Sequence, residues 1–319
     1  MTEQYVRPDV QSFLSLLSGA PRTKTEEVTP AAARLQYDAL RVIADVDAVE
    51  LATMVDLEFD GPCGPLSARL FDGRRRRRPG PVLLFFHGGG FVIGDLDTHA
   101  ALCADMARAL DLPVVALQYR LAPEHRWPAA PEDCEAAARW LAKCPDALGR
   151  RITSLVLAGD SAGGTLAIVT AMTLRDAPAA VPVLAQLVFY PAADMSGSYS
   201  STETFSEGYL LTRASMEWSA EMYAPDFGDW RASPMLGDLT GLPPAVVVTA
   251  GLDPIRDQGR AYASALVAAG VPTVFREASG NIHAFATLRK AIPSSQEDVT
   301  GALSALGRVI AGSQQAHGL

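Results

Sequence analysis

The sequence has no long apolar run and few cysteines. None of its apolar stretches approaches the length of a membrane-spanning helix, and its first residues, MTEQYVRPDV, lack the basic and apolar segments of a secretion signal. We therefore expect a cytoplasmic protein that does not enter the membrane. The 4 cysteines show no CxxC spacing and no pairing with nearby histidines. This pattern predicts reduced thiols, with no disulfide framework and no metal site.

Positive charge is also scarce. The chain has 27 Lys and Arg against 36 Asp and Glu, a formal net charge of −9. Phosphate backbones and anionic lipids repel such a protein, so we expect neither nucleic acid nor a membrane as partner. One local exception is the run of five arginines at residues 74–78. Such runs can bind nucleic acid or membranes, but we interpret this one as a solvated turn between two strands.

What the sequence does have is enough apolar material for one large core. It has 319 residues, of which 49% are hydrophobic and 20% charged. From about residue 53, short β-branched runs alternate with amphipathic helical stretches, a pattern typical of an α/β fold whose mostly parallel sheet carries helices on both faces. We expect strands at 82–87, 114–118, 155–159, 184–190, 245–250 and 273–277.

Two segments fall outside this alternation. In residues 1–50, Thr29 and Pro30 have the residue types of a helix N-cap and first turn, and in residues 194–235 a second helix is expected from Thr212. The second segment carries Met and aromatic side chains, which favours a helical cap over an apolar site. The alternative is a surface excursion that covers sheet edges. We predict a core of residues 51–193 and 236–319 and a cap of residues 1–50 and 194–235.

A candidate nucleophile lies in the segment GDSAG. Gly159 and Gly163 flank Ser161 at G-x-S-x-G spacing, a strand is expected before the motif, and a helix is expected after it. A strand that turns directly into a helix strains the serine backbone and presents its hydroxyl at the carboxyl end of the sheet. The small flanking residues let neighbouring chain pass close by. We predict that Ser161 is a catalytic nucleophile.

A glycine-rich segment, HGGG, follows the strand expected at 82–87. Glycines let backbone N–H groups approach an oxyanion, so we expect an oxyanion hole made by the N–H groups of Gly88, Gly89 and Ala162. The alternatives are a flexible loop or a phosphate loop. The latter is disfavoured because the GxxxxGK[ST] pattern is absent.

The general base and its orienting acid follow from chain order. Of the 5 histidines, His283 comes after the last expected strand, where the order Ser, acid, His places the base. Asp253 directly follows the strand before it and is the preferred acid. Asp257, which can begin a helix, and Asp194, after the preceding strand, stay open as alternatives.

Taken together, these motifs resemble the bacterial hormone-sensitive-lipase-like esterases of the α/β-hydrolase superfamily. The resemblance implies an α/β-hydrolase fold with a helical cap, no cofactor, the roles given above, and supporting roles for Asp160 and Glu124. It also suggests a homodimer that pairs through the strand at 273–277. Three positions depart from the family pattern: Gln258, Asn281 and Ala284. The segments that carry the resemblance are HGGGFVIGD (87–95), YRLAPEHRWPAA (119–130), GDSAGG (159–164), DPIRD (253–257) and GNIHAF (280–285).

The expected function is that of a serine carboxylesterase acting on small-molecule esters with short to medium acyl chains. His283, oriented by Asp253, would take the proton of Ser161 as it attacks, and water would then release the acid from the acyl-enzyme. An amidase or peptidase could use the same triad. A non-catalytic ligand-binding protein is a third alternative, because plant gibberellin receptors resemble this family, but they lack the catalytic histidine that His283 represents here.

Overall fold

A single mixed sheet forms the centre of the computed structural model, which describes residues 4–19 and 23–317. The strand order is β1-β2-β4-β3-β5-β6-β7-β8. Strand β2 is antiparallel to both of its neighbours, and all the pairs from β4 to β8 are parallel. The strands are β1 (Thr53–Gly61), β2 (Gly64–Asp72), β3 (Gly80–Phe86), β4 (Val114–Gln118), β5 (Ile152–Asp160), β6 (Val183–Phe189), β7 (Ala245–Leu252) and β8 (Thr273–Ile282).

All six strands expected from the sequence are present, and β5, β7 and β8 are two to five residues longer than predicted. The two that were not singled out, β1 and β2, form an antiparallel hairpin at one edge of the sheet. Residues of β1 are largely exposed or half-buried, so this strand lacks the continuous apolar run that marks a buried strand. The hairpin was therefore less visible in the sequence than the central strands.

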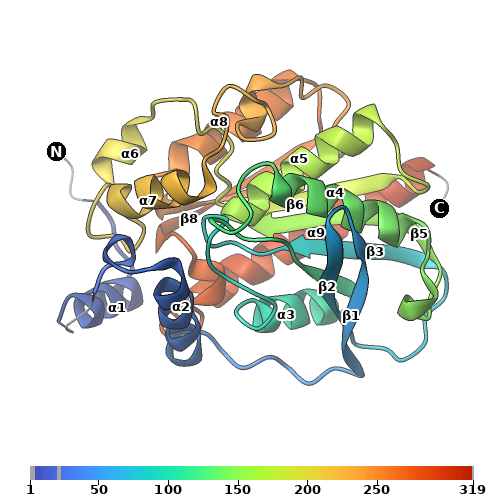
Figure 1. Cartoon of the computed structure of the whole chain (residues 1–319), viewed down its shortest axis with the longest axis horizontal. Coiled ribbons are helices and arrows are strands. Elements are labelled where there is room, and N and C mark those ends of the chain that lie inside the picture. Colours follow the sequence, from blue (N-terminus) through green and yellow to red (C-terminus); the bar gives the residue numbers. More distant parts are fainter. Residues whose placement is uncertain (1–3, 20–22, 318–319) are drawn as a thin grey trace.

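Helices cover both faces of the sheet, as expected for an α/β fold (Figure 1). Helices α4, α5 and α8 pack on one face, and α3 and α9 pack on the other. Strand β3 shows why the sheet needs both layers: Leu84 and Phe86 are buried in the first core cluster, and Leu83 and Phe85 in the second. These helices are α3 (Ala100–Leu110), α4 (Ala129–Ala142), α5 (Ala162–Asp176), α8 (Arg256–Ala268) and α9 (Ser295–His317).

The segments predicted to form the cap contribute helices that lie together at the left end of the molecule in Figure 1. Thr29 caps α2 through its side chain and Pro30 begins it, and Thr212 caps α7, as predicted. The cap boundaries themselves stay a prediction, and residues 1–3 and 20–22 of the first segment lie outside the described residues. The helices are α1 (Pro8–Gly19), α2 (Pro30–Ala44), α6 (Ser200–Thr204) and α7 (Arg213–Tyr223).

A third apolar cluster joins this end of the molecule to the sheet. Phe13 of α1 and Phe205, directly after α6, are buried together with Leu252 and Ile282, which end β7 and β8. The helices are thus fixed to the strand ends that carry Asp253 and His283. Within residues 4–19 and 23–317, none of the helices combines the length and apolarity needed to cross a membrane.

Candidate active site

Ser161 lies at a sharp turn between β5 and α5. Its backbone φ is 52° and its ψ is −121°, a region that side-chain-bearing residues rarely adopt. The close packing around it explains the flanking glycines: a Cβ on Gly163 would lie 2.0 Å from the carbonyl oxygen of Phe86, and one on Gly159 would lie 2.2 Å from that of Gly163. The turn therefore presents the serine hydroxyl at the carboxyl end of the sheet and in front of the α5 N-terminus.

The structure brings Ser161, His283 and Asp253 into one hydrogen-bonded line. His283 Nε2 lies 2.9 Å from Ser161 Oγ, and His283 Nδ1 lies 2.7 Å from Asp253 Oδ2. Asp253 is fully buried, and its other carboxylate oxygen accepts a hydrogen bond from the backbone N–H of Ile255 at 2.9 Å. Tyr190 packs against the histidine ring, with the ring centroids 4.7 Å apart. A buried carboxylate is thus positioned to hold the Nδ1–H tautomer, which leaves Nε2 free to accept the serine proton.

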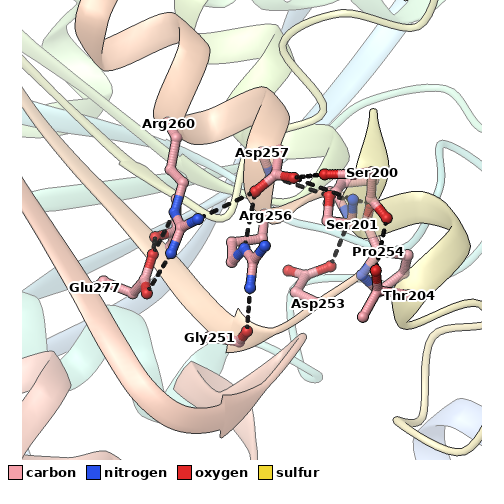
Figure 2. A network of polar contacts seen from close by, with 12 residues as sticks. Ser200, Ser201, Thr204, Gly251, Asp253, Pro254, Arg256, Asp257, Arg260 and Glu277 are labelled. Atoms are coloured by element: carbon pink, nitrogen blue, oxygen red, sulfur yellow. Dashed lines mark hydrogen bonds and ion pairs between the residues drawn. The ribbon is translucent and has the colours of Figure 1, made fainter. Parts of the chain in front are cut away.

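Asp257, one of the two alternative acids, has a different task. Its Oδ2 accepts hydrogen bonds from Ser200 Oγ and Ser201 N–H, both at 3.0 Å, and its Oδ1 from Arg256 Nε at 2.8 Å (Figure 2). Burial opposes ionisation, but these hydrogen bonds and the Arg256 charge hold the pKa of Asp257 below its usual value. Asp257 therefore ties α6 to the start of α8 rather than orienting His283.

Asp194, the other alternative acid, stabilises its own loop. Its carboxylate accepts hydrogen bonds from Ser196 Oγ at 2.6 Å and from Tyr199 Oη at 2.7 Å. Against the effect of burial, these donors keep the pKa of Asp194 below its usual value. Neither of its oxygens bonds to His283 in the part of the chain that the structure describes, so of the three candidates only Asp253 reaches the histidine.

The glycine loop after β3 requires one correction. The sequence predicts that the N–H of Gly88 faces the oxyanion. Instead, this N–H donates to Asp160 Oδ1 at 2.7 Å and is therefore already engaged. The next residues are placed differently. Gly89 has φ +116° and a Cβ there would lie 2.2 Å from the carbonyl oxygen of Ile93, and Gly90 has φ +60°. These two amides, unlike that of Gly88, have no acceptor among residues 4–19 and 23–317.

A buried polar network fixes this loop from behind. His99 Nε2 lies 3.2 Å from Asp160 Oδ1, and Thr98 Oγ1 lies 2.9 Å from His99 Nδ1. Tyr119 donates to the carbonyl oxygen of His87 at 2.8 Å and stacks on its ring. Burial, together with the nearby His99, lowers the pKa of His87 to about 4, so His87 is neutral at pH 7. Asp160 and His87 therefore support the loop, and Asp160 has the supporting position expected from the resemblance.

A cavity of about 650 Å³ opens onto Ser161 and His283. Most of its outer wall comes from the two predicted cap segments, including Leu17, Leu40, Leu210, Met216 and Trp218. The wall is mainly apolar, and Ser161 and His283 are among its polar lining residues. Such a cavity fits an apolar acyl or alcohol group whose polar ester reaches Ser161.

Arg34 is a site-supporting residue that sequence analysis missed. From α2, its Nε donates to the carbonyl oxygen of Val92 at 2.9 Å, its NH2 to that of Ala122 at 2.9 Å, and its guanidinium binds Glu124 at 2.9 and 2.7 Å. The hydrogen bonds from Arg34 hold the pKa of the Glu124 carboxyl below its usual value. Arg34 stands among alanines in an ordinary helical segment, so nothing in its sequence context indicates this contact.

The three departures from the family pattern are all accommodated. Asn281 is fully buried and donates to Ser295 Oγ and Asp298 Oδ2, both at 3.0 Å, so it binds α9 rather than the cavity. Ala284 has φ 64°, a left-handed conformation that glycine adopts without strain. Gln258 lines the cavity and accepts a hydrogen bond from the Asp194 N–H at 3.2 Å.

Comparison with known proteins shows which family the chain belongs to. A family model described as alpha/beta hydrolase fold matches residues 83–287. The chain belongs to this family. Within it, the chain is a bacterial hormone-sensitive-lipase-like esterase, a carboxylic ester hydrolase. The expected family, fold class and enzyme class are thereby confirmed.

Named relatives of this esterase support the assignment. It is 38% identical over 266 residues to Esterase LipI of Mycobacterium tuberculosis, covering 81% of this chain and 83% of the relative. It is also 38% identical to Ethyl acetate hydrolase of Pseudomonas putida over 231 residues, or 71% and 73% of the two chains.

Solved structures agree with the sequence relatives. An ester-hydrolase from the metagenome of Lake Arreo, complexed with a bipyridine phosphonate derivative, superposes with a TM-score of 0.90 at 36% identity, covering 95% of this chain and 98% of the other. A thermostable esterase from Pseudomonas putida ECU1011 gives a TM-score of 0.91 at 29% identity, with 97% and 99% covered. The fold is therefore shared over nearly the whole length.

Proposed function

We propose that this esterase hydrolyses small-molecule esters with short to medium acyl chains through a Ser161, His283 and Asp253 triad and an acyl-enzyme intermediate. The single observation that carries the proposal is the continuous line from Ser161 Oγ to His283 Nε2 at 2.9 Å and from His283 Nδ1 to Asp253 Oδ2 at 2.7 Å. The ester hydrolases among its relatives support the same reaction class.

In the proposed mechanism, Ser161 Oγ attacks the ester carbonyl carbon while His283 Nε2 takes the hydroxyl proton. Asp253 holds Nδ1–H and stabilises the imidazolium that forms, and that imidazolium then protonates the departing alcohol. Water, deprotonated by His283, attacks the acyl-enzyme and releases the acid. In each step a proton moves to or from His283 Nε2, which is consistent with the 2.9 Å between this atom and Ser161 Oγ and with the exposure of both residues to the cavity.

The oxyanion is proposed to bind to the N–H groups of Gly89, Gly90 and Ala162. The amide of Gly88 is engaged by Asp160, and Ala162 begins α5, where a helical N–H has no intrahelical acceptor. Gly90 replaces Gly88 in the set expected from the sequence. Each such donor contributes roughly 3 kcal/mol of transition-state stabilisation.

The proposed chain-length range rests on the cavity. Its volume of about 650 Å³ is shared between the acyl and alcohol groups, and its wall includes Trp218, Phe227 and Met216. Small esters can be enclosed with both ends buried, whereas a long acyl chain would have to leave the cavity.

The test is hydrolysis of a p-nitrophenyl ester series from acetate to palmitate by wild type and Ser161→Ala. We expect turnover of the short and medium chains, and a loss of several orders of magnitude in the variant. Turnover by both proteins would exclude Ser161 as nucleophile. Activity that increases toward palmitate would contradict the proposed chain-length range.

A parallel assay with matched p-nitroanilides tests whether amides are cleaved at comparable rates, as an amidase or peptidase would do.

We also propose a cytoplasmic location, no binding of nucleic acid or membranes, and a homodimer through β8. Its Phe275 has 43% of its surface exposed, and Val274 has 37%. Light scattering of wild type and of Phe275→Asp tests the dimer, since a charge at a β8 interface would yield monomers.

A further inference from the structure

The five-arginine run connects β2 to β3 and is largely exposed to solvent, as predicted. It forms one wall of a second cavity, of about 330 Å³, at the end of the sheet where β3 and β5 begin. The opposite walls come from Leu112 and Pro113 before β4 and from Arg150 and Arg151 before β5. Three segments that are distant in sequence thus converge on this cavity.

Two aspartates order part of the cluster. Asp72, which is fully buried, binds Arg77 at 2.7 Å and also contacts Arg150, and Asp111 binds Arg77 at 3.1 Å and also contacts Arg74. These contacts fix the backbone on either side of the run. They also use the carboxylates completely, since both oxygens of each one are engaged.

The other arginines that line the cavity have no counter-charge among the described residues. The side chains of Arg76, Arg78 and Arg151 make no hydrogen bond or ion pair with residues 4–19 or 23–317, and all three line the cavity. No carboxylate is among the described residues that line it. Six guanidinium groups line the cavity, and the carboxylates of Asp72 and Asp111 offset two of their charges. An excess of four positive charges therefore surrounds one small concave space, in a protein whose net charge is −9.

Like charges that converge in a concavity repel one another, and a bound anion would relieve that repulsion. Guanidinium groups are planar donors that match phosphate oxygens two at a time. The lining residues Pro79, Pro81 and Pro113 restrict the backbone of the walls, which lowers the entropy lost when a ligand binds.

We propose that this cavity binds a small anion that carries two linked phosphate groups, held by Arg76, Arg78 and Arg151. A small ligand is favoured over nucleic acid or a membrane because the positive patch is concave and local. A longer polyanion would extend onto a surface whose overall charge repels it.

The site is separate from the ester-hydrolysing site. Strand β5 begins beside the arginine cavity at Ile152 and ends next to Ser161, so at about 3.3 Å per residue the two sites are roughly 30 Å apart. The proposal therefore does not rest on the proposed mechanism, and substitutions in the arginine cavity should leave ester hydrolysis unchanged.

The experiment is calorimetric titration of the full chain with inorganic pyrophosphate, with ADP and inorganic phosphate in parallel. The cavity variant is R76A/R78A/R151A. The matched control is R41A/R126A/R308A, which removes three arginines that do not line the cavity and whose side chains make no hydrogen bond or ion pair in the described part of the chain. Ester hydrolysis and circular dichroism confirm that both variants are folded.

We expect saturable one-site binding of pyrophosphate that is at least tenfold tighter than that of phosphate, weakened at least tenfold in the cavity variant and unchanged in the control. If ADP binds tenfold more tightly than pyrophosphate, the linked phosphates belong to a nucleotide. If ADP and pyrophosphate bind equally tightly, the ligand is free pyrophosphate. Absence of pyrophosphate binding overturns the proposal. Equal binding of pyrophosphate by wild type and the cavity variant also overturns it. In parallel titrations with phosphatidylglycerol vesicles and single-stranded RNA, binding to either of these without binding to pyrophosphate overturns it as well.

Discussion

The backbone N–H of Gly88 donates to Asp160 Oδ1 at 2.7 Å, so the residue before Ser161 holds the first glycine of the loop after β3. His99 Nε2 lies 3.2 Å from the same oxygen. Burial alone would raise the pKa of Asp160, but its interactions with His99 and the hydrogen bond from Gly88 hold this pKa below its usual value. The turn that carries Ser161 and the glycine loop are therefore joined through one ionised, buried carboxylate.

This link predicts the effect of removing it. Asp160→Ala should lower kcat for p-nitrophenyl acetate by about 100-fold, comparable to the loss of one oxyanion-hole donor, because the loop amides would no longer be held in place. Asp160→Asn should lose less, since the amide oxygen can still accept from Gly88. Steady-state kinetics on variants with wild-type circular dichroism measures both. A kcat for Asp160→Ala within threefold of wild type would disprove the positioning role.

The three candidate acids can be separated by conservative substitutions. Asp253→Asn should lower kcat by about 10⁴-fold, because an amide at this position favours the wrong tautomer of His283. Asp257→Asn and Asp194→Asn are the matched controls, and each should reduce kcat by less than about tenfold, because they remove only loop hydrogen bonds of the ordinary kind. If Asp257→Asn or Asp194→Asn showed the larger loss, our assignment of the acid would be wrong.

Arg34 connects α2 to two active-site loops, so its removal should affect both stability and substrate handling. Arg34→Ala should lower the free energy of unfolding by about 2 kcal/mol, the scale of lost hydrogen bonds from a charged donor to half-buried acceptors. It should also raise KM, since α2 contributes Tyr37 and Leu40 to the cavity wall. The control is Glu124→Gln, which leaves the bonds to Val92 and Ala122 intact. Urea unfolding should show a smaller loss for this control than for Arg34→Ala.

His87 predicts how stability changes with pH. Its folded-state pKa of about 4 lies below the ordinary value of 6.5, so between these values the unfolded chain binds the proton more readily. The free energy of unfolding should therefore fall as pH drops from about 6.5 to about 4, by about 3 kcal/mol in total from this group. The lowered pKa of Asp160 adds its own loss only at lower pH, below its ordinary value of 3.8.

Urea unfolding at several pH values tests this expectation on wild type and His87→Asn. The asparagine cannot titrate, so the variant should show a shallower loss of stability between pH 6.5 and pH 4. Parallel pH profiles for the two proteins would show that another group controls acid stability.

The local sequence determined much of this protein. The central strands, the turn that carries Ser161, the N-caps Thr29 and Thr212, and the position of His283 after the last strand all follow from motifs or periodicities that span a few residues. The reason is that a strained turn, a helix cap or a buried parallel strand each needs particular residue types at neighbouring positions.

The tertiary structure decided what depends on distant partners. It placed Asp253, the acid already preferred from the sequence, against His283 and gave Asp194 and Asp257 other partners, because the three-dimensional path of each loop sets which carboxylate meets the histidine. It engaged Gly88 with Asp160 and attached Arg34 to loops some 60 to 90 residues away. It also brought Arg151 beside the arginine run. Hydrogen bonds and charge clusters of this kind carry no sequence periodicity, so only the folded chain reveals them.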